Sequence, residues 1–290
     1  MNRKPIYNFV LRKNVFVKKG AFKEEVTQRS PKKGLFALTY AMVIFATWCC
    51  VTPVAIAQHQ IEENAENRTT VAMNVNVQKL SKFLPSPWEI DIPASGPWQG
   101  ADLLLEFRDR IMNLDEHMQP IGGGSERGLV LLVPAKNPTT GDSGLRVIRE
   151  YTANPNFLPG LYNNSKLLSR MRLQQALSAE GYDAGVMTQT WDLEEADGGV
   201  ANLLLGYTRG TPKRVNRTYK MFGSSDPSLI RIYHTDQGVD VVKDVAANID
   251  RTTQLKLRVT LKELSPMFDS SERLISVEVV PWYLREVSNP

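Results

Sequence analysis

The sequence contains few of the residues that form disulfides and metal sites, with two cysteines and three histidines among 290 residues. These two cysteines are Cys49 and Cys50, so the chain beyond them has none. That part cannot form a disulfide within itself and must fold on its packed core alone. His59, His117 and His234 lie far apart and outside any His-x-x-x-His spacing. We predict no metal site, because a zinc centre needs several such ligands close together.

The sequence also lacks the short motifs of common active sites. It has no Gly-x-Ser-x-Gly nucleophile elbow, and its glycine-rich run at 121–128 lacks the Gly-Lys-Ser/Thr ending of a phosphate-binding loop. His234 is the best catalytic candidate by default, and Trp191 beside Glu194 would suit a sugar-binding surface. Neither feature forms a recognisable constellation, so we predict no catalytic residue and no cofactor.

One long stretch, Leu35–Ala57, has no charged residue. Its 23 positions would span about 34 Å as a helix, enough to cross a bilayer. Residues 1–34 hold ten basic and two acidic residues, and such basic flanks stay in the cytoplasm. Leu35–Ala57 is therefore predicted to be a transmembrane anchor, or a signal peptide that is cleaved after Ala57, where Ala-Ile-Ala precedes Gln58.

These features predict four parts of the chain. A basic cytoplasmic tail (1–34) and the apolar segment (35–57) precede a polar linker (58–69) and an exported domain (70–290), which could divide near 155–160. Beyond residue 57 the chain has 25 of the 35 basic and 29 of the 31 acidic residues, a net charge of about −4. The excess of basic residues belongs to the N-terminal tail, so we predict no nucleic-acid binding.

Hydrophobic periodicity predicts both strands and helices in the exported domain. Apolar residues alternate with polar ones at 70–78, 255–262 and 275–279, and the last two segments are expected to form an antiparallel pair. An uninterrupted apolar run at 129–133 is typical of a buried strand, and 145–151 is expected to form a hairpin with it. Helical spacing of apolar residues predicts helices at 100–119 and 164–180. A third helix near 239–249 is a weaker prediction. The expected fold class is α+β, with a mixed, mostly antiparallel sheet and two or three packed helices.

One local concentration of charge lies in the exported domain, near two tyrosines. Its cations would suit an anionic ligand or an acidic partner, although a solvated hairpin turn gives the same pattern. The candidate patch consists of Arg209, Lys213, Arg214, Arg217 and Lys220.

The sequence resembles no family that we recognise over any substantial part of its length. We expect a non-enzymatic subunit of a bacterial cell-envelope assembly, such as a secretion, conjugation, pilus or cell-wall machine, that acts by binding other envelope proteins. It would lie in the inner membrane facing the periplasm, anchored through 35–57, or be periplasmic or secreted after cleavage. An exported hydrolase or carbohydrate-active enzyme and a eukaryotic type II membrane glycoprotein are the alternatives.

Overall fold

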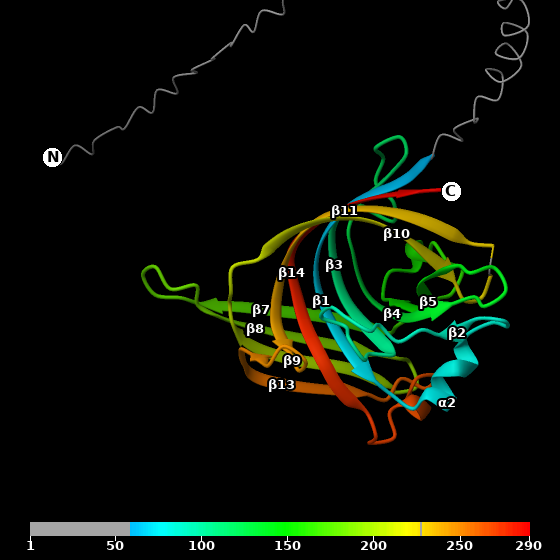
Figure 1. Cartoon of the computed structure of the whole chain (residues 1–290). Coiled ribbons are helices and arrows are strands. Elements are labelled where there is room, and N and C mark those ends of the chain that lie inside the picture. The colour runs from blue at the N-terminus through cyan, green and yellow to red at the C-terminus, as the bar shows by residue number, and fades with distance from the viewer. Residues whose placement is uncertain (1–58, 227) are drawn as a thin grey trace, which may run out of the picture. The chain divides into compact units, whose positions relative to one another are not determined.

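A computed structural model describes residues 59–226 and 228–290, and these residues are dominated by strands (Figure 1). Strands make up 58% of them and helices 6%. The strands are β1 (Gln60–Asn74), β2 (Glu89–Ile90), β3 (Leu103–Asp115), β4 (Glu126–Lys136), β5 (Ser143–Thr152), β6 (Ser165–Leu167), β7 (Arg170–Ser178), β8 (Val186–Glu194), β9 (Val200–Thr208), β10 (Lys213–Gly223), β11 (Ile230–Asp244), β12 (Ile249–Asp250), β13 (Thr252–Val259) and β14 (Arg273–Ser288). The α-helix α2 (Val77–Leu80) and the 3₁₀ turns η1 (Ser81–Phe83), η2 (Pro155–Phe157) and η3 (Ser265–Met267) are short.

Seven long strands close into a barrel. Their order is β4, β3, β1, β14, β11, β10 and β5, and β5 also pairs with β4. Every contact in this ring is antiparallel except that of β10 with β5, which is parallel. The ring encloses an interior that side chains from all seven strands can reach.

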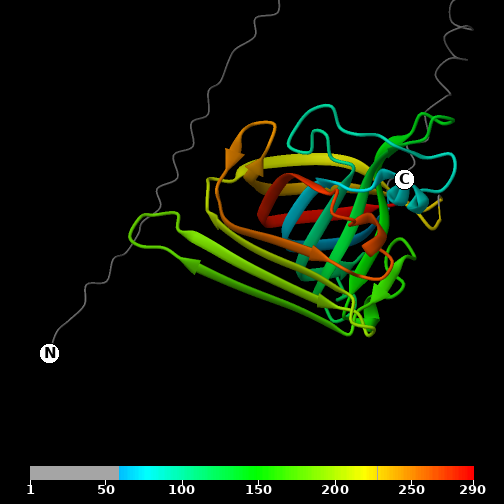
Figure 2. The same cartoon turned by 90° about the horizontal axis from the view of Figure 1, so that it is seen from below.

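A second sheet, in the order β13, β9, β8 and β7, packs against the outside of the barrel. Figure 2 shows this sheet as a separate layer, with the β7–β8 hairpin extending past the barrel. Phe107 of β3 and Trp191 of β8 meet between the two layers, with 5.7 Å between their ring centres. The main hydrophobic core therefore lies between the barrel wall and the second sheet.

The alternation along β3 shows how one strand serves two environments. Leu103, Leu105 and Phe107 face the second sheet, whereas Leu104 and Glu106 face the barrel interior. Successive strand residues point to opposite faces, so both faces of this strand are buried. The first residues of β3, Leu103–Leu105, are therefore apolar on both faces, and the charged residues Glu106, Arg108 and Arg110 that follow face the barrel interior. Asp109, on the opposite face, pairs with Arg127.

The predicted α+β fold class is wrong, because every segment predicted as a long helix forms strands. Residues 100–119 contain β3, 164–180 contain β6 and β7, and 239–249 contain the end of β11. The apolar residues that recur at helical spacing in 100–119, such as Leu103, Phe107 and Leu114, are also compatible with a strand whose two faces are both buried. Other predictions hold: 129–133 and 145–151 are paired strands in β4 and β5.

Two further expectations also need revision. Residues 60–69, expected to be a linker, form the first part of β1. The strands near 255–262 and 275–279 do not pair with each other, since β13 pairs with β9 and β14 lies between β1 and β11.

The predicted apolar segment 35–57 and the basic tail 1–34 lie outside the residues that the structure describes. Within the described ranges, none of the helices has the length and apolar character needed to cross a bilayer.

Candidate functional site

The interior of the barrel is lined by charged side chains. Strands β1, β3 and β14 supply most of them, because their residues at alternate positions point inward. Four arginines and six glutamates from the barrel strands are buried here. The arginines are Arg68, Arg108, Arg110 and Arg285, and the glutamates are Glu62, Glu66, Glu106, Glu126, Glu150 and Glu278.

These charges form ion pairs inside the barrel. Nη2 of Arg285 donates to Oε1 of Glu62 at 2.7 Å, and Nη1 of Arg110 donates to Oε2 of Glu126 at the same distance. Arg108 pairs with Glu106 from the same strand. A buried charge is costly unless it is paired, so each of these contacts is needed to keep its partner inside the fold.

Burial alters the proton affinity of one of these carboxyl groups. Loss of solvent raises the pKa of Glu126 to about 7, although the charge of Arg110 acts in the opposite direction. The neighbouring carboxylate of Glu150 raises the pKa further. The carboxyl group of Glu126 therefore keeps its proton up to about neutral pH.

The barrel encloses a cavity of about 550 Å³ at the other end of this charged interior. Its volume falls in the range of small-molecule sites, which run from about 300 to 1,000 Å³. Apolar walls are supplied by residues such as Ile232 and Val280. Its polar side chains include Arg68, Glu106, Arg217, Tyr219, Gln237 and Glu278, and Trp98 lines it as well.

Glu278 is the carboxyl group of this cavity with the clearest perturbation. Its side chain comes from β14 and only 6% of the residue is exposed. Burial raises the pKa of Glu278, while the hydrogen bond from Nε1 of Trp98 to Oε2, 2.7 Å long, and the charges of Arg68 and Arg217 lower it. Burial has the larger effect, so the carboxyl group holds a proton more tightly than in water.

Arg68 is held rigidly at the cavity wall. Nη2 donates to Oε1 of Gln237 at 2.9 Å, and Nη1 lies 3.3 Å from Oε1 of Glu106. The guanidinium carbon also lies 4.4 Å from the centre of the Tyr283 ring. These contacts fix a planar cation where it can meet an anionic ligand with little loss of side-chain freedom.

The structure separates the predicted cationic patch. Lys213, Arg214, Arg217 and Lys220 lie on β10, and Arg209 precedes this strand. Arg217 is exposed and lines both the cavity and a second, outer hollow, whereas Nε of Arg214 donates to Oδ1 of Asp236 at 2.9 Å on the outer surface. Of the five, only Arg217 and Lys220 are among the residues that line the cavity.

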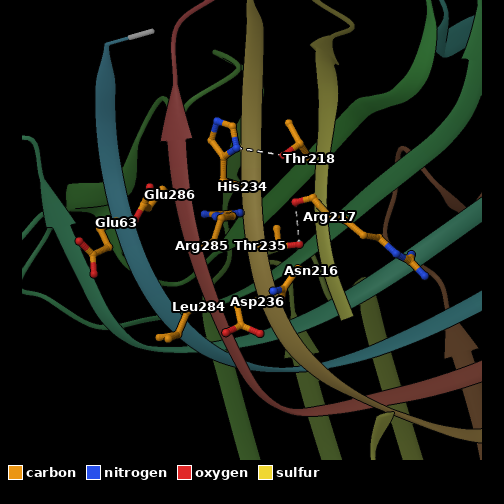
Figure 3. A pocket seen from close by; sticks show the side chains of 10 residues that line it. All are labelled: Glu63, Asn216, Arg217, Thr218, His234, Thr235, Asp236, Leu284, Arg285 and Glu286. Carbon is orange, nitrogen blue, oxygen red and sulfur yellow. Dashed lines mark hydrogen bonds between the residues drawn. The ribbon is translucent and has the colours of Figure 1, made fainter. Parts of the chain in front are cut away.

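A second hollow of about 500 Å³ lies on the outer surface of β1, β14, β11 and β10 (Figure 3). His234 is here, and its Nδ1 lies 3.0 Å from Oγ1 of Thr218. The carboxylates of Glu63 and Glu286 also point to this side. The hollow is the more open of the two, whereas the interior cavity holds the buried carboxyl group of Glu278 with its raised pKa, so the interior cavity is the better candidate site.

No lysine in the described ranges is buried, and all except the half-buried Lys243 are exposed. Lys220 borders the cavity from β10, but its neighbours Tyr219 and Met221 occupy the inward positions. Imine formation with a carbonyl substrate needs an amine nucleophile in the site. The described part of the barrel interior offers none. In the same ranges, no group of three or more suitable side chains could hold a metal ion.

Sequence reasoning missed the interior site altogether. Glu106, Arg108 and Arg110 lie two residues apart, and charged residues at this spacing indicate a polar face of a strand. That signal was present within 100–119, where a helix was predicted. The approach of Trp98 to Glu278 joins residues 180 positions apart and has no local signal.

The sequence matches no known family profile and no curated protein. Several solved structures share the fold, among them the following two. An acetoacetate decarboxylase-like enzyme from Sphingomonas wittichii RW1 has a TM-score of 0.50 at 9% identity, covering 80% of this chain and 91% of that one. The enduracididine biosynthesis enzyme MppR, complexed with pyruvate, has a TM-score of 0.50 at 10% identity, covering 82% and 91%.

This similarity corrects the predicted function. The fold is one that enzymes use, which contradicts the prediction of a non-enzymatic subunit of an envelope assembly in the bacterial inner membrane or periplasm. At these identities the likeness establishes the fold alone. The chemistry has to come from the residues of this chain's own cavity.

Proposed function

We propose that the barrel cavity is the active site of an enzyme that transfers a proton on a small carboxylate carrying a carbonyl group. The observation that carries this proposal is the presence of a carboxyl group of raised pKa, Glu278, in the same cavity as the guanidinium groups of Arg68 and Arg217. Perturbed carboxyl groups beside cations in a cavity are typical of catalytic sites.

The charges of the cavity favour an anionic ligand. Two guanidinium groups, Arg68 and Arg217, face the carboxyl groups of Glu106 and Glu278. Burial raises the pKa of Glu278, which disfavours its negative form and shifts the balance of charge towards the cations. A carboxylate of the ligand would pair with the guanidinium groups, and the apolar residues around them would exclude water. MppR, which has this fold, is described in complex with pyruvate, so a small 2-oxo acid is a suitable probe.

Glu278 would act as the acid and base of the reaction. In its ionised form the carboxylate removes a proton from the carbon next to the ligand's carbonyl group, and the electron pair of that C–H bond moves to the carbonyl oxygen. The resulting enolate is stabilised by the nearby cations and is reprotonated by the same carboxyl group. A raised pKa suits this role, because a base is most effective when its pKa is near the working pH.

Exchange of pyruvate methyl protons with D₂O, followed by NMR, tests this proposal. We expect the protein to accelerate exchange above the background rate and Glu278→Gln to lower the acceleration by about 100-fold or more. The glutamine side chain keeps an oxygen that can accept from Trp98. Glu286→Gln is the matched control, because Glu286 lies on the same strand and faces the outer hollow. Binding of pyruvate without any acceleration of exchange would rule out the catalytic role.

A further inference from the structure

The strand β7 presents a long unpaired edge. In the described part of the chain it pairs only with β8 and is the last strand of its sheet. The hairpin that it forms with β8 projects past the barrel (Figures 1 and 2). Leu177 on this strand is 49% exposed, and Tyr182 at the tip of the hairpin is fully exposed. Backbone donors and acceptors along the outer side of β7 are therefore available to another strand.

Features that normally protect a sheet edge are missing from most of β7. The strand has no proline, and its pairing with β8 runs from Arg170 to Ser178 without a bulge. Its only charged residues, Arg170 and Arg172, lie at its first end. By contrast β13, at the other edge of the same sheet, carries Lys256 and Arg258 within the strand. Charged residues of this kind disfavour edge-to-edge association, so β7 is the less protected edge.

We propose that β7 pairs antiparallel with β7 of a second copy of this chain, about a twofold axis at Gln175. The two four-stranded sheets then become one continuous sheet. In this register Leu173 lies opposite Leu177 of the partner, and Arg172 lies opposite Ser178. Beyond the strand end, Arg170, which also pairs with Glu194 of β8 at 2.7 Å, faces Glu180 of the partner, so unlike charges meet on both sides of the axis.

The sequence of the edge selects this register. Residues with odd numbers, such as Leu173, face the barrel side of the sheet, since Leu173 packs against the main core. A shift by one residue would place apolar positions of one copy opposite polar positions of the other. A shift of the axis to Gln174 would keep the faces but would leave Arg170 opposite Ser178 and Leu173 opposite Gln175. Only the axis at Gln175 gives both the leucine pair and the arginine–glutamate pair.

Symmetry makes a second copy the best occupant of this edge. A twofold interface needs a surface that is complementary to itself, and β7 meets this need in both charge and apolar pattern. The same operation applied to β13 about its central residues would bring Lys256 close to Lys256 or Arg258 of the partner, which is unfavourable.

Cross-linking through single cysteines tests the register in the full chain, with Cys49→Ser and Cys50→Ser as the background. Gln175→Cys places two cysteines opposite each other, at a Cα separation of about 5 Å that suits a disulfide. Arg172→Cys is the matched control, because it is equally exposed but lies about 20 Å from its own copy in this register. We expect rapid oxidation to a covalent dimer for Gln175→Cys and none for Arg172→Cys.

Analytical ultracentrifugation of the uncrosslinked full chain gives the second readout. We expect a dimer, with a dissociation constant that Gln175→Lys raises about tenfold or more, because two like charges then meet at the axis. Unchanged circular dichroism and thermal unfolding midpoint would show that the variant still folds. A monomeric unmodified protein, equal cross-linking of both cysteine variants, or a dimer that Gln175→Lys leaves intact would overturn the proposal.

Discussion

At the scale of single residues, the stability of the barrel interior depends on buried arginines. Their guanidinium groups contact carboxylates and aromatic rings, and an exposed arginine would contact water at the same positions. Arg285 is the clearest example, with 1% of its surface exposed. Its guanidinium pairs with Glu62 and lies 4.8 Å from the centre of the Tyr233 ring. A buried ion pair of this kind adds little to the free energy of unfolding by itself. Removing one partner is nevertheless costly, because the other charge then stays buried without its partner.

We expect Arg285→Ala to lower the free energy of unfolding by about 3–5 kcal/mol, because Glu62 is left as a buried, uncompensated charge. The control is Arg214→Ala, which removes the exposed pair with Asp236 on the outside of the barrel and should lower the free energy of unfolding far less, because solvent screens this pair. Chemical denaturation of both variants measures the difference. Equal decreases in the free energy of unfolding for the two variants would contradict the proposed role of the buried ion pair between Arg285 and Glu62.

Glu126 gives the molecule a pH dependence with a definite sign. Its pKa in the folded state is about 7, above the ordinary value of 4.5, mainly because of burial. Between these two pH values the folded state keeps a proton that the unfolded state has released. The free energy of unfolding therefore falls as pH rises through this window.

We predict that Glu126→Gln removes this decline, which is on the order of 2–3 kcal/mol across the window. Glutamine can still accept a hydrogen bond from Arg110. Denaturation at several pH values between 4.5 and 7.5 measures the slope for each protein. Parallel curves for the two proteins would show that Glu126 titrates normally in the folded state.

At the scale of elements, the barrel closes where β5 meets β10, and Gly144 is the residue that allows this contact. A Cβ atom at this position would lie 2.8 Å from the carbonyl oxygen of Lys220 and 3.0 Å from the Phe222 ring. Gly144 also lines the cavity. The close approach of β5 to β10 and the shape of the cavity therefore both depend on the absence of a Cβ atom at Gly144.

Gly144→Ala should separate β5 from β10, lowering the free energy of unfolding by about 1–3 kcal/mol and weakening ligand binding. Ser143→Ala is the control for stability, because Ser143 lies on the same strand, is exposed and loses a single atom in this substitution. Thermal unfolding and pyruvate titration calorimetry measure the two effects. A Gly144→Ala variant with unchanged stability and binding would contradict the proposed closure.

The elements also show what the sequence could and could not predict. Uninterrupted apolar runs predicted β4, and alternation predicted β13, since each pattern has one simple explanation. The segment that forms β3 was predicted to be a helix because both its faces are buried, so its apolar residues satisfy two periods at once. The partners of β13 and β14 were also missed, because pairing across a long chain has no local signal.

At the scale of the whole molecule, the site was hidden because its residues come from strands that are distant in sequence. Trp98, Arg68 and Glu278 meet only when the barrel closes. The search for local motifs therefore found none, and the basic patch that it favoured contributes Arg217 and Lys220 to the lining of the cavity. The lack of a motif was a property of the fold and carried no information about whether the protein is an enzyme.

The interior's lack of lysine within the described ranges gives a chemical prediction for the whole protein. Treatment with pyruvate and sodium borohydride should produce no covalent adduct, because imine chemistry needs an amine that points into the site. Lys220, at the border of the cavity, is exposed and lies between Tyr219 and Met221, which occupy the inward positions of β10. Intact-protein mass spectrometry checks this outcome. A stoichiometric mass increase on a lysine would replace the Glu278 mechanism with imine catalysis.

The central claim is that the barrel cavity binds a small carboxylate beside Arg68, Arg217 and Glu278. A crystal structure of the full chain grown with pyruvate tests it most directly. The account predicts electron density for the ligand inside the barrel, with its carboxylate at one of the two guanidinium groups and Glu278 within reach of its carbon chain. An empty cavity, or pyruvate bound only in the outer hollow beside His234, would contradict it.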